Sequence, residues 1–283
     1  MVTGEINSLQ GIHLDSSEAA ANQELELRCL LSPFDLRFVC LNKSTKAFIR
    51  MGVINSDNGS SWSPGSLKSL FSDLLNQDKS IQSLICSLSG LPFTLVPASI
   101  SDRSLNDQFL KIVHGEEASN VQENLLEDRD TKIISSPPGY WKDEIAQVFP
   151  AVQIELHIKS ELNKILQVGA SGKRNLVYAY QGQSYLQLAA WDKAKGLVLA
   201  NQFETGATED SLFFVSNAIA SLKFDSEETS IVLGGDIPSD GMLYHSLNKY
   251  YKNISHPRIK PSVETNGFLS SFAASIIGWD LCE

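Results

Sequence analysis

The chain has 283 residues, of which 33 are acidic and 23 are basic, and its formal net charge at pH 7 is −10. This length is enough for one large or two medium domains, each with its own hydrophobic core. The acidic balance, without a marked cluster of lysine and arginine, argues against a nucleic-acid-binding surface. The 5 histidines and 4 cysteines lack metal-ligand spacing, so no metal site is predicted.

The N-terminus has no basic start followed by an apolar run, and no apolar stretch approaches the roughly 20 residues of a membrane-spanning helix. Cys29, Cys40 and Cys86 lie in apolar runs, where cysteine behaves as a small hydrophobe, and Cys282 lies near the end of the chain. We therefore expect reduced thiols, a cytoplasmic protein and no membrane insertion.

After a polar N-terminal arm, short apolar runs alternate with turns, which predicts three antiparallel strands in a meander. Ser63 and Pro64 then predict a helix start, with serine as the N-cap and proline in the first turn. Apolar residues recur at helical spacing from Leu67 to Leu75. The expected elements are an arm over 1–24, strands over 25–31, 36–41 and 47–54, a helix after residue 63 and a strand over 81–88.

The middle of the chain is less regular. An acidic stretch over 116–130 predicts an irregular, solvated loop, with a helical turn over Val121 to Leu126 as an open alternative. Gly169 to Asn175 is the clearest predicted linker. The other expected elements are strands over 93–97, 131–135 and 152–158 and helices over 105–113, 140–149 and from 161.

The second half repeats the order of the first. Two turns join three predicted strands, and Thr208-Glu209-Asp210 opens a helix, with a hydroxyl that can cap it and carboxylates that complement its dipole. A buried strand then ends in Gly234-Gly235. The expected elements are strands over 176–180, 184–191, 197–203 and 230–233, a helix around Leu243 and Leu247, an edge strand over 258–263 and a last helix over 268–277.

The repeated order is three strands, a helix, a strand and a helix. It predicts an α/β fold of two ribonuclease-H-like domains, each a mixed sheet flanked by helices, which is the architecture of the actin-like ATPase superfamily. We expect the first domain to span residues 25–168 and the second to span residues 169–283.

Several stretches resemble a bacterial protein family of unknown function with an actin-like ATPase fold. They are Phe93-Thr94-Leu95-Val96-Pro97, Asn201-Gln202-Phe203, Thr208 to Phe214, Leu222 to Asp225, Ile231 to Gly234 and Leu281-Cys282-Glu283. The resemblance implies the duplicated fold and no established reaction. More distantly, the layout is similar to the cytoplasmic scaffold domains of pilus-assembly and type II secretion machines, which is an analogy of fold.

Active members of the superfamily carry Asp-x-Gly-Ser/Thr-like phosphate loops at the first hairpin of each half, where glycine admits phosphate and aspartate holds a metal or water. Here the first hairpin has Asp35 but no following glycine, and Pro33 removes a donor. The second has Gly182 and Ser184, but Gln181 stands where a carboxylate is expected. Two ordinary hairpin turns are the favoured interpretation.

Gly234-Gly235-Asp236 lies where the superfamily's adenosine loop would lie, although a strand-to-helix turn that needs positive φ explains the glycines more simply. Thr208 to Asp210 is likewise explained by capping rather than by catalysis. No catalytic residue is predicted, and ATP is a possible cofactor that no intact motif supports. The candidate cleft positions are Asp35, Gly182, Ser184, Gly234, Gly235 and Asp236.

The leading hypothesis is a non-catalytic scaffold or regulatory protein of the bacterial cytoplasm. It would bind a protein partner or a small ligand in the cleft between the halves, with a degenerate nucleotide site. The alternative is a nucleotide-binding protein, such as a weak ATPase or a sugar-kinase-like phosphotransferase. A ribonuclease-H-type nuclease is the least expected activity, because the predicted strands over 36–41 and 184–191 carry no carboxylate. The sequence makes no prediction of oligomeric state.

Overall fold

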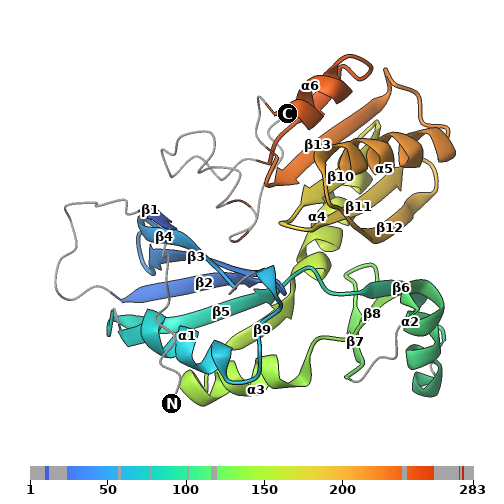
Figure 1. Ribbon diagram of the computed structural model, residues 1–283. Coiled ribbons are helices and arrows are strands. Elements are labelled where there is room, and N and C mark those ends of the chain that lie inside the picture. Colours follow the sequence, from blue (N-terminus) through green and yellow to red (C-terminus); the bar gives the residue numbers. More distant parts are fainter. Residues whose placement is uncertain are drawn as a thin grey trace. The chain divides into compact units, whose positions relative to one another are not determined.

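A computed structural model describes residues 10–12, 24–56, 59–76, 78–100, 102–115, 120–237 and 241–257, with Ala274 and Ile276. The chain forms two compact units (Figure 1). The described part of the first unit lies within residues 10–89 and 138–156, and that of the second within 90–137 and 157–257, with Ala274 and Ile276. Each unit therefore combines separate segments of the chain. The predicted domains, residues 25–168 and 169–283, follow the repeated order of elements and stay a prediction.

In the described part of the first unit, six strands form one sheet in the order β1-β4-β3-β2-β5-β9. β2, β3 and β4 are antiparallel neighbours, and β5 returns beside β2 in parallel. This arrangement confirms the predicted meander with a crossover strand. The bounds are β1 Gln10–Ile12, β2 Leu25–Leu31, β3 Asp35–Asn42, β4 Phe48–Asn55, β5 Ile81–Leu88 and β9 Gln153–Leu156.

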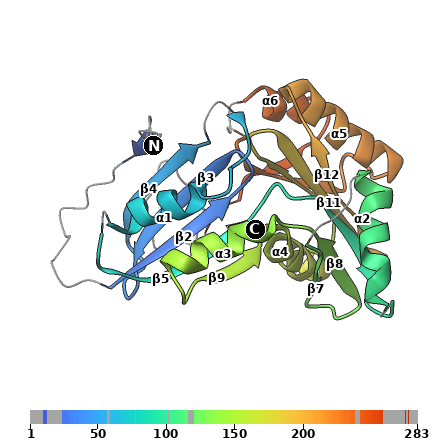
Figure 2. The ribbon, with the colours of Figure 1, turned by 60° about the horizontal axis from the view of Figure 1, so that its bottom comes forward.

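Two helices, α1 (Ser66–Asn76) and α3 (Gly139–Val148), lie side by side against this sheet (Figure 2). The apolar stripe of α1 is buried, as its helical spacing predicts. The expected cap at Ser63 is wrong, because the helix begins at Ser66. Instead, Glu144 of α3 accepts hydrogen bonds from the main-chain N–H groups of Gly65 (2.5 Å) and Lys68 (3.2 Å). The cap of α1 is therefore supplied by a distant part of the chain.

We expect Glu144→Ala to lower the free energy of unfolding by about 1–2 kcal/mol, because it leaves two N–H groups at the start of α1 without their acceptor. Chemical denaturation measures this loss. Asp143→Ala is the matched control, because the Asp143 carboxylate is exposed. This substitution should lower the free energy of unfolding by less than about 0.5 kcal/mol. Equal losses in the two variants would contradict the capping role.

A smaller sheet belongs to the second unit. Its described strands run in the order β6-β8-β7, and helix α2 packs on it through Leu110 against Val96 and Ile134. The irregular loop expected over 116–130, and the alternative of a helical turn over Val121 to Leu126, are both wrong for Gln122–Leu125, which form a strand paired with β8. The bounds are β6 Phe93–Pro97, η2 Arg103–Leu105, α2 Asn106–His114, β7 Gln122–Leu125 and β8 Thr131–Ser135.

The larger sheet of the second unit has the described strand order β12-β11-β10-β13-β14, with β10 and β13 parallel. Alternate residues of β10 and β11 pack with α5 and α6 into one apolar core. Residues of the opposite parity, including Tyr180 and Trp191, contact α4. The bounds are α4 His157–Ser171, β10 Asn175–Gln181, β11 Tyr185–Asp192, β12 Gly196–Glu204, α5 Thr208–Ser221, β13 Thr229–Gly235, α6 Met242–Asn248 and β14 Asn253–Ser255.

The predicted linker over Gly169 to Asn175 is wrong in its first part, because α4 continues to Ser171. Gly169 lies inside the helix, where a Cβ would come within 2.4 Å of the Trp191 ring, so close packing explains this glycine. The edge strand expected over 258–263 and most of the helix expected over 268–277 lie outside the described residues, as does most of the N-terminal arm. No helix in the described residues is long and apolar enough to cross a membrane.

Candidate functional site

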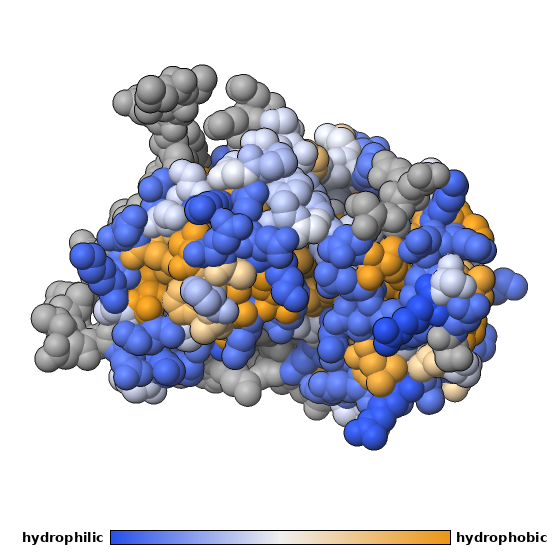
Figure 3. Space-filling view, turned by 90° about the horizontal axis from the view of Figure 1, so that it is seen from below, coloured by the Kyte–Doolittle hydropathy of each residue, from blue (hydrophilic) through white to orange (hydrophobic). Residues whose placement is uncertain are grey.

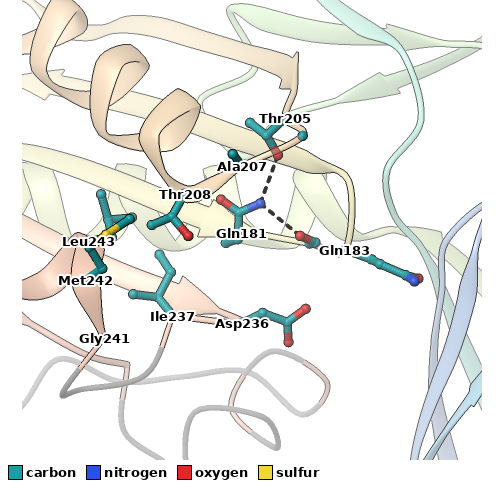
Figure 4. A pocket seen from close by; sticks show the side chains of 12 residues that line it. Gln181, Gln183, Thr205, Ala207, Thr208, Asp236, Ile237, Gly241, Met242 and Leu243 are labelled. Carbon is teal, nitrogen blue, oxygen red and sulfur yellow. Dashed lines mark hydrogen bonds between the residues drawn. The ribbon is translucent and has the colours of Figure 1, made fainter.

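A pocket with a volume of about 490 Å³ opens in the second unit, between three loops (Figure 4). Residues 181–183 come from the end of β10 and the turn after it, and residues 205–208 from the loop after β12 and the first residue of α5. Residues 236–237 follow β13, and residues 241–243 are the N-cap and the first residues of α6. Because β10 and β13 are parallel and both end here, the pocket lies at the carboxyl edge of these strands. Ligands of open α/β sheets bind preferentially at this edge.

Gln181 stands at the base of the pocket, and hydrogen bonds hold its side chain in place. Its Nε2 donates to the Gly182 carbonyl (2.9 Å), the Tyr185 carbonyl (3.1 Å) and Thr205 Oγ1 (3.0 Å). Its Oε1 accepts from the Ser211 hydroxyl. The residue at the expected carboxylate position is thus a neutral amide that ties the hairpin turn to the β12–α5 loop and to α5.

Packing accounts for the glycine of the same turn. A Cβ on Gly182 would lie 2.2 Å from the Tyr185 ring, and the Gly182 N–H donates to the Tyr185 carbonyl (2.8 Å). Ser184 is outside the pocket lining, and its carbonyl accepts from the Thr205 N–H (3.0 Å). Of the two candidates in this turn, Gly182 lines the pocket and Ser184 does not.

Close packing explains both glycines at the end of β13, against the main chain at Gly235 and against a side chain at Gly234. Gly235 has φ +75°, and a Cβ there would lie 2.1 Å from the Gln181 carbonyl oxygen. A Cβ on Gly234 would lie 2.9 Å from the Tyr178 hydroxyl. Asp236 is exposed, lines the pocket, and donates from its N–H to the Gln181 carbonyl (2.8 Å). Asp236 is therefore the one candidate of this loop that lines the pocket.

The start of α5 forms the opposite rim. Thr208 is the first helical residue and Ala207 is the N-cap, so the expected hydroxyl cap is wrong. Asp210 Oδ2 instead accepts from the N–H groups of Gly206 (2.8 Å) and Ala207 (3.0 Å). Glu209 and Asp210 lie in the first turn, as expected for complementing the helix dipole. A carboxylate of the chain thus occupies donors that a bound anion would need.

The first hairpin turn belongs to the first unit, and Asp35 is not among the residues that line the pocket. Asp35 is 3% exposed. Its Oδ2 accepts from Arg37 Nε (2.7 Å), its Oδ1 accepts from the Ser32 hydroxyl, and its N–H donates to Ser32 Oγ (3.0 Å). Both carboxylate oxygens therefore hold the turn closed.

Trp62 contacts this turn from a later part of the chain. The sequence analysis did not identify it, because it lies in a stretch that looks like a polar loop. Its indole Nε1 donates to the Ser32 carbonyl (2.7 Å) and its N–H to the Pro33 carbonyl (3.2 Å). The Tyr140 hydroxyl in turn donates to the Trp62 carbonyl (2.5 Å). In the sequence, the one indication of this contact is a lone tryptophan among polar residues, since a large aromatic side chain is usually buried. The first turn is thus covered by a buried aromatic side chain.

A buried polar cluster beneath β10 was also missed. On α4, His157 Nε2 lies 3.2 Å from Glu161 Oε1, and the His157 ring lies 4.7 Å from the Tyr180 ring. Burial, and then the Glu161 carboxylate, raise the pKa of the Tyr178 hydroxyl well above its ordinary value. The i, i+4 spacing of His157 and Glu161 was the signal in the sequence. These contacts fix α4 against the sheet.

The described cysteines are buried free thiols, namely Cys29, Cys40 and Cys86. Burial raises the pKa of Cys40 to about 11 and raises those of Cys29 and Cys86 as well, which makes the reactive thiolate scarce at neutral pH. Within the described ranges, no group of three or more His, Cys, Asp or Glu is arranged to hold a metal ion.

Two solved structures share this fold. One is a Bacteroides thetaiotaomicron protein with an actin-like ATPase fold and unknown function, with 16% identity, a TM-score of 0.68, and coverage of 86% of this chain and 93% of that chain. The other is the PilM-PilN type IV pilus biogenesis complex, with 10% identity, a TM-score of 0.62, and coverage of 91% of this chain and 98% of that chain. The expected actin-like ATPase fold is therefore confirmed.

No curated protein matches the chain. A family described as "Protein of unknown function (DUF3822)" matches residues 15–254, which is most of the chain. The resemblance to a family of unknown function is confirmed, and the chain belongs to this family.

Proposed function

We propose that this protein is a non-catalytic scaffold or regulatory protein of the bacterial cytoplasm, which binds a small ligand or a protein partner through the pocket of its second unit. One observation carries the proposal. At both hairpin turns, the side chain at the position of the expected carboxylate is hydrogen-bonded within its own unit. Asp35 accepts from Arg37 and Ser32, and Gln181 is hydrogen-bonded to its neighbours in the second unit.

The chemistry of phosphoryl transfer supports this assignment. An ATPase of this fold needs a carboxylate free to hold magnesium or to orient the attacking water. Asp35 is buried and paired, and Gln181 has no charge. Neither side chain can take that role without breaking the turn that it stabilises.

The purified chain with ATP and magnesium is expected to release no phosphate above the rate of a protein-free blank. Because Asp35→Ala is expected to destabilise the first unit and the Gln181 side chain ties together the second hairpin turn, the informative variant is Asp236→Asn, which keeps the size of an exposed side chain of the pocket lining. Hydrolysis by the wild-type chain that Asp236→Asn abolishes, with an unchanged melting temperature, would overturn the non-catalytic proposal.

A second candidate is a nucleotide-binding protein, and the position of the pocket favours it. The pocket lies at the carboxyl ends of β10 and β13 with the start of α5 on its rim. A nucleotide at 100 times its Kd would raise the free energy of unfolding by about 2.7 kcal/mol. The absence of a thermal shift with ATP, ADP and GTP would remove this candidate.

A protein partner is supported by two observations. The PilM-PilN structure is a complex of two proteins with a similar fold in one of them. On this chain, Ile112 of α2 is 79% exposed and Phe213 of α5 is 61% exposed. Figure 3 shows groups of apolar residues bordered by hydrophilic ones on one face. Contiguous apolar surface is typical of sites that contact another molecule, whereas apolar residues exposed singly are ordinary.

A further inference from the structure

We propose that a surface on α5 and β12 binds an amphipathic helix of a partner protein, one that carries lysine or arginine beside leucine or another apolar residue. The surface consists of an aromatic cluster, Phe203, Phe213 and Phe214, and of the carboxylates of Glu209 and Asp210. The inference rests on the proposed function, which includes a protein partner. It goes further by naming the chemistry of that partner and a contact surface outside the pocket lining.

The three rings of the aromatic cluster are contiguous. The Phe203 ring of β12 stacks on the Phe214 ring of α5, with the ring centroids 4.3 Å apart and the planes at 17°. The Phe213 ring meets the Phe214 ring edge-on, with the centroids 5.5 Å apart and the planes at 69°. Phe203 and Phe214 are half-buried and pack against the apolar core, whereas Phe213 is 61% exposed. Phe213 is therefore the exposed end of a cluster that is anchored in the core.

The elements that carry these rings are regular and well packed. β12 is the outermost described strand on its side of the larger sheet of the second unit. α5 is held on this sheet through Ser211, Val215 and Ile219, which are buried on the opposite side of the helix from Phe213. A rigid aromatic side chain on a fixed helix loses little conformational freedom when it is covered, and aromatic residues are enriched at the centres of protein interfaces. Phe213 therefore has the properties of an interface anchor.

The charges beside Phe213 on α5 are negative. Glu209 and Asp210 precede Phe213 by four and three residues, so they are its neighbours on the helix surface. Asp210 Oδ2 accepts from two main-chain N–H groups but keeps its charge, and Glu209 is exposed. No lysine or arginine occurs from Gly196 to Leu222, the stretch that contains β12 and α5. Two carboxylates exceed the roughly half-unit positive charge of a helix N-terminus, so they favour a cationic partner.

This combination of groups fits a basic amphipathic helix. Glu209 and Phe213 are one helical turn apart, and a partner with lysine one turn from leucine presents the complementary groups at the same spacing. The next exposed positions of α5 after Phe213 are Asn217 and Ala220, whose short side chains let a second helix approach. The net charge of −10 adds a long-range attraction for a basic partner. An acidic segment would meet like charge, and a purely polar one would leave the Phe213 ring without an apolar contact.

The test is a titration of the full ¹⁵N-labelled chain with a capped helical peptide, followed by NMR chemical shifts. The peptide has about 15 residues, with leucine and lysine one turn apart on one stripe and alanine elsewhere. Two matched peptides replace every lysine with glutamate or every leucine with alanine. We expect the leucine–lysine peptide to shift resonances of α5 around Phe213, and each matched peptide to bind at least about tenfold more weakly.

Variants of the chain locate the contact. Phe213→Ser should weaken the Kd of the leucine–lysine peptide at least about tenfold, because it removes the aromatic anchor. Ile112→Ser removes an apolar side chain that is 79% exposed on α2 and should change Kd less than about twofold. Glu209→Gln should weaken Kd about threefold, whereas Asp143→Asn, which removes one exposed charge from α3, should leave it unchanged. These four side chains are exposed, so the melting temperature of each variant should match that of the wild-type chain.

The inference is overturned if the leucine–lysine peptide shifts no resonances of α5, if the glutamate peptide binds as tightly, or if Phe213→Ser and Ile112→Ser weaken binding equally. Sedimentation velocity tests a second copy of the chain as the occupant. A wild-type dimer that Phe213→Ser converts to a monomer would show self-association and would also overturn the inference. Peptide shifts confined to the pocket lining would remove this surface and leave the proposed function intact, whereas ATP hydrolysis would remove the proposed function without changing the peptide result.

Discussion

Replacing Gly235 with alanine is expected to lower the free energy of unfolding by more than about 3 kcal/mol, which is exceptional for the addition of one methyl group. Two effects combine at this position. The backbone has φ +75°, which disfavours a residue with a Cβ, and the added Cβ would lie 2.1 Å from the Gln181 carbonyl oxygen. That oxygen is main chain in the neighbouring strand, so it can move only if β10 and β13 separate at the pocket. Urea denaturation followed by far-UV circular dichroism measures the loss.

Gly115→Ala is the matched control. Gly115 has φ +74°, almost the same backbone conformation, but nothing lies within 4 Å of its added Cβ. Gly115→Ala should lower the free energy of unfolding by about 1 kcal/mol, because the only penalty is a residue with a Cβ in the left-handed backbone conformation. The difference between the two variants therefore isolates the steric clash. A Gly235→Ala variant as stable as Gly115→Ala would show that the end of β13 tolerates a side chain, and the glycine would then need another explanation.

Asp35→Ala is expected to lower the free energy of unfolding by about 3–5 kcal/mol. The substitution leaves Arg37, which is 5% exposed, without the carboxylate that accepts from its Nε at 2.7 Å. It also takes an acceptor from the Ser32 hydroxyl in the closed first turn. Removing one partner of a buried ion pair is costly because the surrounding protein solvates the remaining charge less well than water does. Chemical denaturation of the wild-type chain and the variant at neutral pH measures the effect.

Glu24→Ala is the control for this pair. Glu24 accepts from Lys43 Nζ at 3.3 Å, but both side chains are exposed, and such pairs contribute about 0–1 kcal/mol. Raising the salt concentration should reduce the effect of Glu24→Ala and leave that of Asp35→Ala largely unchanged, because salt screens exposed charges. If Asp35→Ala lowered the free energy of unfolding as little as Glu24→Ala does, the Asp35 carboxylate would not be needed to hold the turn, and a role in ATP hydrolysis would become tenable.

Local patterns in the sequence were enough for the order of elements. Leu67, Leu70, Phe71 and Leu74 are buried on α1, as their helical spacing predicts, and the three-strand meanders are present in both large sheets. These features depend on neighbours within a few residues along the chain. The predicted helix start at Ser63 is wrong because it depends on a distant residue. The acceptor for the first turn of α1 is Glu144, 79 residues beyond Gly65.

In the candidate site, too, local sequence predicts some features and contacts between distant residues decide the others. Two of the six candidate positions, Gly182 and Asp236, line the pocket, and the sequence had placed both in turns at strand ends. The sequence also showed that Gln181 carries no charge. It could not show that this amide binds Thr205 and Ser211, since those residues come from another loop and from α5.

The sequence by itself therefore determined the duplicated α/β plan and the absence of a carboxylate in the second turn, because periodicity and residue identity are local properties. The tertiary structure alone decided that Asp35 is paired and buried, that Trp62 covers the first turn, and that Asp210 takes the donors beside the pocket. Burial and hydrogen bonding depend on which distant segments meet. These contacts close both hairpin turns, and among the described residues that line the pocket of the second unit Asp236 is the one with a charged side chain.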